Sequence, residues 1–392
     1  MKLRFVTYAY PPLFYPRSLQ ISLLARALSP RHDLEVVAAD FGRCSDSLSS
    51  LCADCRTIRV SQSYVGDIVS RMQGDCIKRW LLLDEMFLHL GAFRDRLDQL
   101  LWDDVHLITF GQPMSMHLLG LRYKKRYPNL RWTAHFSDPW NYADYSLHKG
   151  LALSLNHYYE GKVYRAADSL IFTSTETMDY ALKGNYSIFM KKAHAVPHGY
   201  DALLYKTGKT CKIGILRIGY FGVFYGKRQP YSLFSALRLI QRQDENILHN
   251  LKIEFYGAGD GTAYTDSIGG LEKYLSFNPG VDFMDSLRLS SQMDGLLVID
   301  APAQVSPFFP SKLADYIGSG RPIFGITPPG TSARILHELG MPVADPASVE
   351  QVARTFHGFI DDLRQRTLQL NEQARLNYRS DHVADVFMNA IA

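Results

Sequence analysis

Short apolar runs alternate with stretches of helical spacing along this chain, and the alternation occurs twice. Because successive strands separated by helices must be joined by crossovers, the pattern favours parallel sheets with helices on both faces. In the first half, we predict strands over Leu3–Tyr8, Leu34–Ala39, Val105–Phe110, Arg131–Phe136, Ser169–Ser174 and Ala193–Pro197. The helices between them are predicted over Leu19–Leu28, Ser115–Arg126 and Tyr158–Ala167.

A second alternation follows a polar stretch over 199–213 that has no periodicity and is interpreted as a linker. Its predicted strands are Leu216–Phe221, Leu251–Tyr256, Gly295–Ile299 and Pro322–Ile326. Its predicted helices are Tyr231–Ile240, one at Ser311 and a long helical region from Ser348. A chain of 392 residues suits two domains better than one. The fold class is therefore α/β, with two doubly wound units.

Composition excludes several other classes. Apolar residues make up 46% of the chain, which is enough for two cores, and the net charge of +4 does not indicate nucleic acid as a partner. No apolar run approaches the ~18 residues of a membrane span. The apolar start meets Pro11-Pro12 at once, unlike a signal peptide, so we expect a cytoplasmic protein.

The five cysteines argue against a disulfide framework. Cys52 and Cys55 have the spacing of a metal-binding pair, but Cys44 and Cys76 do not form a second pair. Ordinary thiols are the favoured interpretation, with a structural zinc site or a redox pair as alternatives. We expect no metal or other cofactor.

The stretch from Ser306 to Ile323 carries the most chemical information. It predicts a loop stiffened by prolines, a helix capped by Ser311 and stopped by Gly318 and Gly320, and a new strand. A helix N-terminus at such a loop suits an anion, and Asp315 is expected on the polar side one turn later, where it can accept from hydroxyls. Phosphate and hydroxyl groups together indicate a nucleotide sugar.

This stretch resembles the donor segment of glycosyltransferases with the GT-B fold, in particular the large retaining family four of bacterial polysaccharide and lipopolysaccharide enzymes. The shared pattern is Pro-Ser-Lys-Leu-x-Glu-Tyr followed by Gly-Arg/Lys-Pro, and here it runs from Pro310 to Tyr316 and from Gly320 to Pro322. Asp315 stands in place of the usual Glu, and Pro307 in place of a second Glu.

The resemblance implies two facing Rossmann-like domains with a cleft between them. Residues 1–200 would bind the acceptor, 201–213 would be the linker, 214–373 would bind the nucleotide sugar, and a helix over about 374–392 would cross back. It also implies retention of the anomeric configuration without a metal. Lys312 and Asp315 would contact the donor, together with the helix tip at Ser311.

On the acceptor side, the resemblance covers four segments, of which three contain candidate site residues. The turn after the first strand lacks the family's glycines, and Arg17 offers a side-chain anion contact in their place, with an exposed turn and a capping Ser18 as the alternative. His135 and Asp138 lie in a segment similar to the family's Asp-Phe-Arg-Asp-Pro-Trp, and both are candidate catalytic residues; a packed histidine and a turn aspartate are the alternatives. Ser174 ends another strand as a further acceptor-side candidate.

The fourth segment is Gly111-Gln-Pro-Met-Ser-Met-His117, which resembles a motif of a bacterial polysaccharide subgroup. It lies at a strand–helix junction, where doubly wound sheets bind ligands. His117 is expected to pack or cap rather than to catalyse.

On the donor side, Gly222 follows a predicted strand and is followed by Lys227 and Arg228. Two adjacent cations suit a departing diphosphate, with a solvated surface as the alternative. Gly257 and Gly259 form a second turn, expected near the base or the diphosphate. Neither turn matches the dinucleotide fingerprint, so an NAD enzyme is not expected.

Basic and aromatic residues interleave at 78–83 and 122–127, which suits a peripheral contact with anionic lipid, although a solvated helix face remains open. The resulting hypothesis is transfer of a sugar from a nucleoside-diphosphate sugar to a glycan or lipid-linked glycan. The alternatives are a non-catalytic sugar- or nucleotide-binding partner protein and a nucleotide-sugar epimerase.

Overall fold

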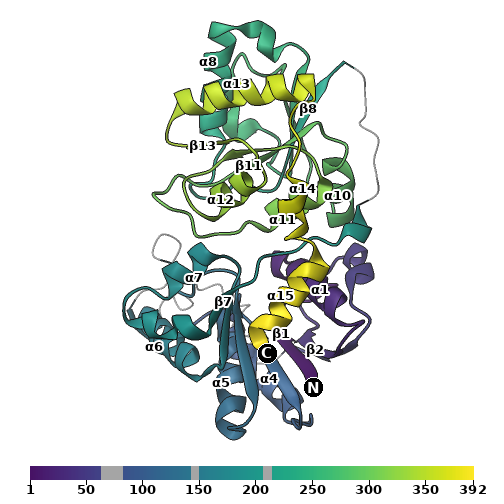
Figure 1. Ribbon diagram of the computed structural model, residues 1–392, viewed down its shortest axis with the longest axis vertical. Helices are drawn as coiled ribbons and strands as arrows, with labels where there is room; N and C mark the ends of the chain where they lie inside the picture. Colours follow the sequence, from purple (N-terminus) through teal and green to yellow (C-terminus); the bar gives the residue numbers. More distant parts are fainter. Residues whose placement is uncertain (63–82, 143–149, 206–213) are drawn as a thin grey trace. The chain divides into compact units, whose positions relative to one another are not determined.

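The computed structural model describes residues 1–62, 83–142, 150–205 and 214–392. The chain forms two compact units (Figure 1): the first unit comprises residues 1–198 and 383–392, and the second comprises residues 199–382. Each unit is built on one parallel sheet with helices on both faces. Cys76, the basic stretch 78–82 and most of the predicted linker, residues 206–213, lie outside the described residues.

The first sheet has seven strands, β1 (Lys2–Thr7), β2 (Asp33–Ala39), β3 (Arg56–Val60), β4 (Val105–Phe110), β5 (Arg131–Phe136), β6 (Ser169–Phe172) and β7 (Ala193–Ala195). Their spatial order is β3-β2-β1-β4-β5-β6-β7, and all pairs are parallel. The six predicted strands are confirmed. Sequence patterning missed β3, whose run Arg-Thr-Ile-Arg-Val is short and partly polar.

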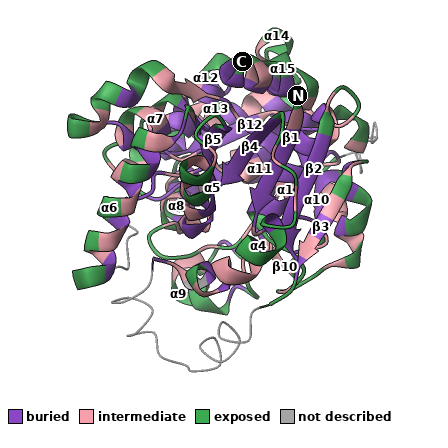
Figure 2. Cartoon of the chain, turned by 90° about the horizontal axis from the view of Figure 1, so that it is seen from below, coloured by how far each residue is buried: buried purple, intermediate pink, exposed green. Residues whose placement is uncertain are grey.

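Helices cover both faces of this sheet because side chains alternate across a strand. One face packs under α1 (Pro16–Leu28) and α15 (Ser380–Ile391), where the ring of Phe5 lies 4.8 Å from Phe110 and 6.2 Å from Phe387. The other face packs under α4 (Leu90–Leu97), α5 (His117–Arg126), α6 (Gly150–Ala166) and α7 (Thr175–Ala181). The strands are buried along most of their length, whereas the outer faces of helices such as α6 are exposed (Figure 2).

The second sheet has six strands, β8 (Leu216–Phe221), β9 (Leu251–Tyr256), β10 (Leu275–Asn278), β11 (Gly295–Ile299), β12 (Ile323–Ile326) and β13 (Val343–Ala344). Their order is β10-β9-β8-β11-β12-β13, again all parallel. The four predicted strands are confirmed. The pattern missed β10 and β13, which have only four and two residues and cannot show a period.

Two helices, α8 (Tyr231–Gln243) and α13 (Val349–Gln365), pack on one face of the second sheet (Figure 1). The other face packs against α11 (Ser311–Ser319) and α12 (Thr331–Glu338). Ser348 caps α13 and accepts from the Gln351 amide at 3.2 Å, so the predicted start of this helix is confirmed.

Two predicted helix caps are wrong. Helix α1 begins two residues earlier than Ser18, and the Ser18 hydroxyl is buried without a hydrogen-bond partner among the described residues. Helix α11 has Pro310 at its N-cap, so Ser311 is its first helical residue and makes no side-chain cap. In α1, Pro16 takes the first helical position, and in α11, Pro310 takes the N-cap, so neither serine stands at the cap.

The C-terminal end of α11 is decided by Gly320, whose φ of +70° is the left-handed conformation of a helix cap. Gly318, also predicted as a stop, instead lies inside the helix. A Cβ at Gly318 would stand 2.4 Å from the ring of Tyr205, so this glycine is needed for packing. No helix in the described ranges has the length and apolar character of a membrane span.

Candidate functional site

The order of strands reverses between β1 and β4 in the first unit. In an open parallel sheet, ligands bind beside the carboxyl ends of the strands at such a reversal. The segments that leave β1, β4 and β5 therefore form the first candidate site. They bring together Arg17, His135 and Asp138.

Arg17 is buried in this site, with only 2% of its surface exposed. Its guanidinium donates to the Gly111 carbonyl at 3.2 Å and to Gln20 Oε1 at 3.0 Å, and its Nη2 lies 2.8 Å from Nδ1 of His135. Burial lowers the pKa of Arg17 to about 10, and the nearby charge of Asp138 partly opposes this effect. The residue thus lies in the first turn of α1 rather than in an exposed turn.

His135 is equally buried, on the side of the sheet that carries α1. Its ring lies 5.0 Å from that of Phe110. Burial lowers the pKa of His135 well below its ordinary value, and the charge of Arg17 lowers it further. The pKa of neighbouring His198 is lowered to about 3 by burial and by the same arginine. The imidazole of His135 is therefore neutral at physiological pH.

Asp138 follows β5 and is half-buried. Its carboxylate accepts a hydrogen bond from the side-chain amide of Gln112, which in turn accepts from the Ser137 hydroxyl at 3.2 Å. The backbone of Gln112 has φ +61°, which aims its side chain back across the end of the sheet. Gln112 was not singled out from the sequence, although its position directly after β4 is the signal that could have found it.

The loop after Asp138 is anchored on α6. Trp140 Nε1 donates to Asn156 Oδ1 at 2.7 Å, and Asn141 Nδ2 donates to Glu160 Oε2 at 2.8 Å. Burial raises the pKa of the Glu160 carboxyl. These contacts hold the segment that carries Asp138, and only the folded helix shows them.

Two other predicted residues of the first unit, His117 and Ser174, make hydrogen bonds within the fold. His117 is completely buried, with Nδ1 2.7 Å from Thr109 Oγ1 and its ring against Phe136, as expected for a packed histidine. Ser174 caps α7 and accepts from the Thr177 amide at 3.0 Å. Its hydroxyl is thus engaged within the fold.

The second unit has the corresponding reversal of strand order between β8 and β11. Arg228, in the segment after β8, lies with Nη2 3.3 Å from Oδ1 of Asp300, the residue after β11. Thr327, after β12, donates to the other oxygen of Asp300 at 2.9 Å. Asp300 is only 2% exposed and was missed from the sequence. Lys227 is exposed beside this cluster.

The turns after β8 and β9 approach each other closely. Gly257 and Gly259 have φ of +87° and +85°, which other residues rarely adopt. A Cβ at Gly257 would stand 3.4 Å from the Gly222 carbonyl oxygen. The three predicted glycines therefore shape the rim of this site.

The N-terminus of helix α11 has no side-chain cap and no acidic residue in its first turn, while the Leu313 amide donates to the Pro310 carbonyl at 2.9 Å. Asp315 was expected on the polar side of this helix, but it is only 8% exposed. Burial raises the pKa of its carboxyl, and Lys312, whose Nζ lies 3.5 Å from Oδ2, partly offsets this effect. The hydroxyl of Tyr205 donates to the Asp315 carbonyl at 2.9 Å and covers that side of the helix.

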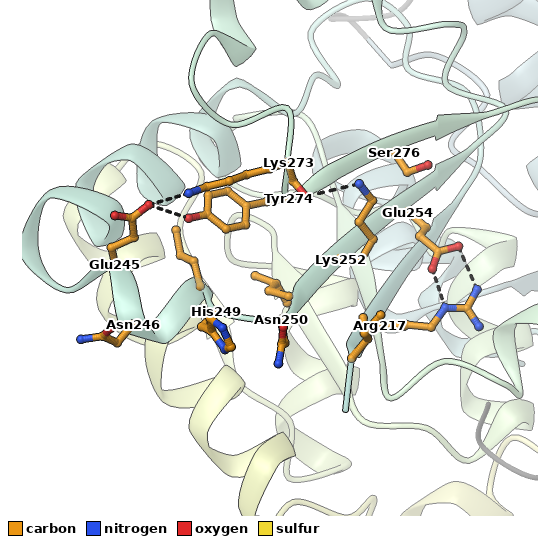
Figure 3. Close-up of a pocket in the computed structure, with 13 residues that line it drawn as sticks. Arg217, Glu245, Asn246, His249, Asn250, Lys252, Glu254, Lys273, Tyr274 and Ser276 are labelled. Carbon is orange, nitrogen blue, oxygen red and sulfur yellow. Dashed lines mark hydrogen bonds and ion pairs between the residues drawn. The ribbon is translucent and has the colours of Figure 1, made fainter. Parts of the chain in front are cut away.

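A cavity of about 990 Å³ lies elsewhere in the second unit, along the amino ends of β8, β9 and β10 (Figure 3). Two ion pairs line it, Lys273–Glu245 at 2.7 Å and Arg217–Glu254 at 2.5 Å. The candidate site lies at the carboxyl ends of the same sheet, so this cavity is a different feature. It contains none of the predicted site residues.

Metal and thiol chemistry has little support in the described part of the chain. No cluster of three or more potential metal ligands occurs there, and Cys44, Cys52 and Cys55 are free thiols. Burial raises the pKa of the Cys52 and Cys55 thiols, which opposes the thiolate form that binds metal.

The basic stretch at the end of α5 has four cations, and two carboxylates, Asp98 and Asp168, offset part of its charge. Lys124 lies 2.9 Å from Asp168, and Arg126 lies 2.8 Å from Asp98. Tyr123 is buried beneath them. This arrangement is that of a solvated, ion-paired helix end.

The two-unit architecture, with a site at the strand reversal of each Rossmann-like sheet, is the GT-B fold of glycosyltransferases. No family model and no curated protein matches the sequence. Solved structures do match over nearly the whole chain. A glycosyltransferase from Rickettsia africae ESF-5 has a TM-score of 0.66 at 11% identity and covers 100% of this chain and 98% of its own.

Two further solved structures have the same fold. HepE from Anabaena, in complex with UDP and glucose, has a TM-score of 0.67 at 13% identity, with 100% of this chain and 99% of that chain covered. WaaG, a glycosyltransferase involved in lipopolysaccharide biosynthesis, has a TM-score of 0.62 at 16% identity, with 99% and 98% covered. The predicted fold class is thus confirmed.

Proposed function

We propose that this protein is a glycosyltransferase that moves a sugar from a nucleoside-diphosphate sugar to a glycan or lipid-linked glycan acceptor. The observation that carries the proposal is the arrangement at the strand reversal of the second unit. There Arg228 is held by Asp300, in a unit whose helix α11 has no side-chain cap at its N-terminus. A cation and an uncapped helix N-terminus both suit a diphosphate.

The donor would be bound by the second unit. Breaking the bond between sugar and phosphate builds negative charge on the diphosphate, and Arg228, Lys227 and the amides from Ser311 would oppose it. Lys312 and Asp315 would lie beside the nucleoside, with Asp315 accepting from ribose hydroxyls directly or through a water. Gly222, Gly257 and Gly259 would let the backbone approach the ligand.

The acceptor would be bound by the first unit. Asp138 would accept a hydrogen bond from the acceptor hydroxyl and fix its direction of attack, since Gln112 already orients the carboxylate. His135 and Arg17 would complete this site, and Ser174 would support the adjacent strand end. Retention of configuration and independence from metal belong to the same proposal, as does a cytoplasmic location with peripheral membrane contact.

The proposal is tested in two steps. Thermal unfolding is measured with uridine, guanosine and thymidine diphosphates; one of them at 100 times its Kd should stabilise the protein by about 2.7 kcal/mol. Transfer and hydrolysis are then measured with the matching nucleotide sugars and candidate acceptors. Binding without either reaction would favour the non-catalytic alternative, and the absence of any nucleotide binding would contradict the proposal. Vesicles of anionic and neutral lipid separately test the membrane contact.

A further inference from the structure

The contact between Arg17 and His135 determines which hydrogen-bonding group the histidine can offer. Nη2 of Arg17 lies 2.8 Å from Nδ1 of His135. A guanidinium has five N–H donors and no acceptor, and it stays protonated in proteins. Nδ1 must therefore carry a lone pair, because two N–H groups cannot face each other at this distance.

A neutral imidazole that accepts at Nδ1 carries its hydrogen on Nε2. We propose that Arg17 is a positioning residue that holds His135 in this tautomer, so that the ring offers an N–H donor to a substrate hydroxyl instead of a base. The substrate in this statement rests on the proposed function. The tautomer does not, since it follows from the contact itself.

The guanidinium is fixed well enough to impose this choice. Its Nε donates to the carbonyl of Gly111, after β4, and its Nη1 to Gln20, one turn along α1. The amide of Gly111 in turn donates to the carbonyl of His135 at 2.8 Å. Arg17 thus joins the ends of β4 and β5. Rotation of its guanidinium away from His135 would break its hydrogen bonds to Gly111 and Gln20.

Arg17 also differs from an arginine with a purely structural role in how its charge is paired. Buried Arg4, for comparison, forms an ion pair with Glu35 at 2.7 Å. Within the described ranges, no carboxylate lies within salt-bridge distance of Arg17. Asp138 acts on Arg17 from beyond that distance, and protonation of His135 would place two cations side by side in a buried site.

The other groups around His135 agree with a neutral ring. His198, after β7, and His117, on α5, act on it electrostatically, and burial lowers the pKa of both to about 3. Helix α15 contributes the ring of Phe387, 6.4 Å away. Asp138 is the acid that acts on Arg17 from the end of β5.

The direct test is nitrogen NMR of protein labelled at its histidines, with His135 assigned by its loss in His135→Gln. The wild type should show an unprotonated Nδ1, a protonated Nε2, and no titration of this ring between pH 5 and 8. In Arg17→Met, the ring should populate both tautomers and its titration midpoint should rise, because a neighbouring positive charge has been removed. Arg17→Lys, which keeps one donor and the charge, should retain the wild-type tautomer.

Gln20→Ala is the matched control, because it removes a different contact of the same guanidinium. It should leave the tautomer of His135 unchanged. A hydrogen on Nδ1 in the wild type overturns the proposal, and this result needs no variant to fold. A folded Arg17→Met protein with the wild-type tautomer and titration overturns it as well.

Kinetics separate positioning from a merely structural role. Arg17→Met should keep its nucleotide affinity, since the nucleotide is bound by the second unit, while kcat falls about tenfold and gains an acidic limb that the wild type lacks. An equal loss at every pH, without a new limb, would contradict the proposed positioning. A wild type that lacks transfer activity would refute the proposed function, yet the NMR result would still decide the tautomer.

Discussion

Nη2 of Arg228 lies 3.3 Å from Oδ1 of Asp300, and this ion pair joins the segments that follow β8 and β11, the two central strands of the second sheet. The carboxylate is almost fully buried, whereas the guanidinium is about one-fifth exposed. The pair therefore fixes a cation at the strand reversal and leaves part of it accessible. Predictions concern this arginine and four other positions, which are Asp315, Asp138, Gly318 and Gly358.

Substitution of Arg228 should weaken the binding of nucleoside diphosphate. Arg228→Ala removes the cation that would contact the phosphates, so affinity measured by calorimetry should fall at least tenfold, or about 1.4 kcal/mol. Circular dichroism should show an intact fold. Arg242→Ala, at an exposed position on α8, is the matched control and should bind like the wild type. Equal affinity of Arg228→Ala and the control would remove Arg228 from the site.

Substitution of Asp315 should separate donor binding from stability. Asp315→Asn keeps the shape but removes the carboxylate, so the donor KM should rise several-fold. Because burial raises the pKa of Asp315 in the folded state, ionisation of this group opposes folding as the pH rises above its ordinary pKa of 3.8. The variant should therefore be at least as stable as the wild type at pH 7, with the difference vanishing in acid.

Two measurements check the Asp315 prediction. Thermal unfolding from pH 4 to pH 8 follows stability, and initial rates at varied donor concentration give KM. If Asp315→Asn melts at a lower temperature than the wild type at pH 7 but not at pH 4, the ionised carboxylate stabilises the fold, against the prediction. An unchanged KM would show that Asp315 does not contact the donor.

Substitution of Asp138 should impair transfer without affecting the nucleotide. Asp138→Asn retains the size of the side chain, but it loses the charge that, on the proposed function, would orient the acceptor hydroxyl. We expect transfer to fall at least tenfold, about 1.4 kcal/mol in the barrier. Nucleotide-induced thermal shifts should be unchanged. Asp95→Asn, at an exposed position on α4, serves as the control, and full activity in Asp138→Asn would leave Asp138 as a turn residue only.

Two glycine substitutions should have opposite effects on stability. A methyl group at Gly318 would stand 2.4 Å from the ring of Tyr205, so Gly318→Ala should destabilise the protein by about 1–3 kcal/mol. Gly358 lies inside α13 with open space around its Cβ position, so Gly358→Ala should stabilise by up to about 1 kcal/mol. Denaturant unfolding of both variants checks the pair. Equal changes in unfolding free energy would mean that helix propensity, and not the Tyr205 contact, determines the effect of Gly318→Ala.

The sequence alone determined the fold class and most of the sheet. Central strands such as β4 and β9 were predicted with their observed bounds, because buried parallel strands are continuous apolar runs bounded by turn residues. The glycine-rich turn after β8 and the motif from Pro310 to Pro322 were likewise visible, since turns and helix ends depend on local backbone preferences. Short or polar edge strands such as β3 and β10 were not visible in the sequence, because they are stabilised by pairing with neighbouring strands and not by an apolar pattern of their own.

The tertiary structure alone decided how the candidate residues are used. It buried Arg17 against His135 and paired Arg228 with Asp300, across 118 and 72 positions of the chain. It also buried Asp315, whose helical spacing had suggested a polar surface. Contacts of this kind depend on which strand ends become neighbours in a sheet, and no local pattern of residues encodes that order.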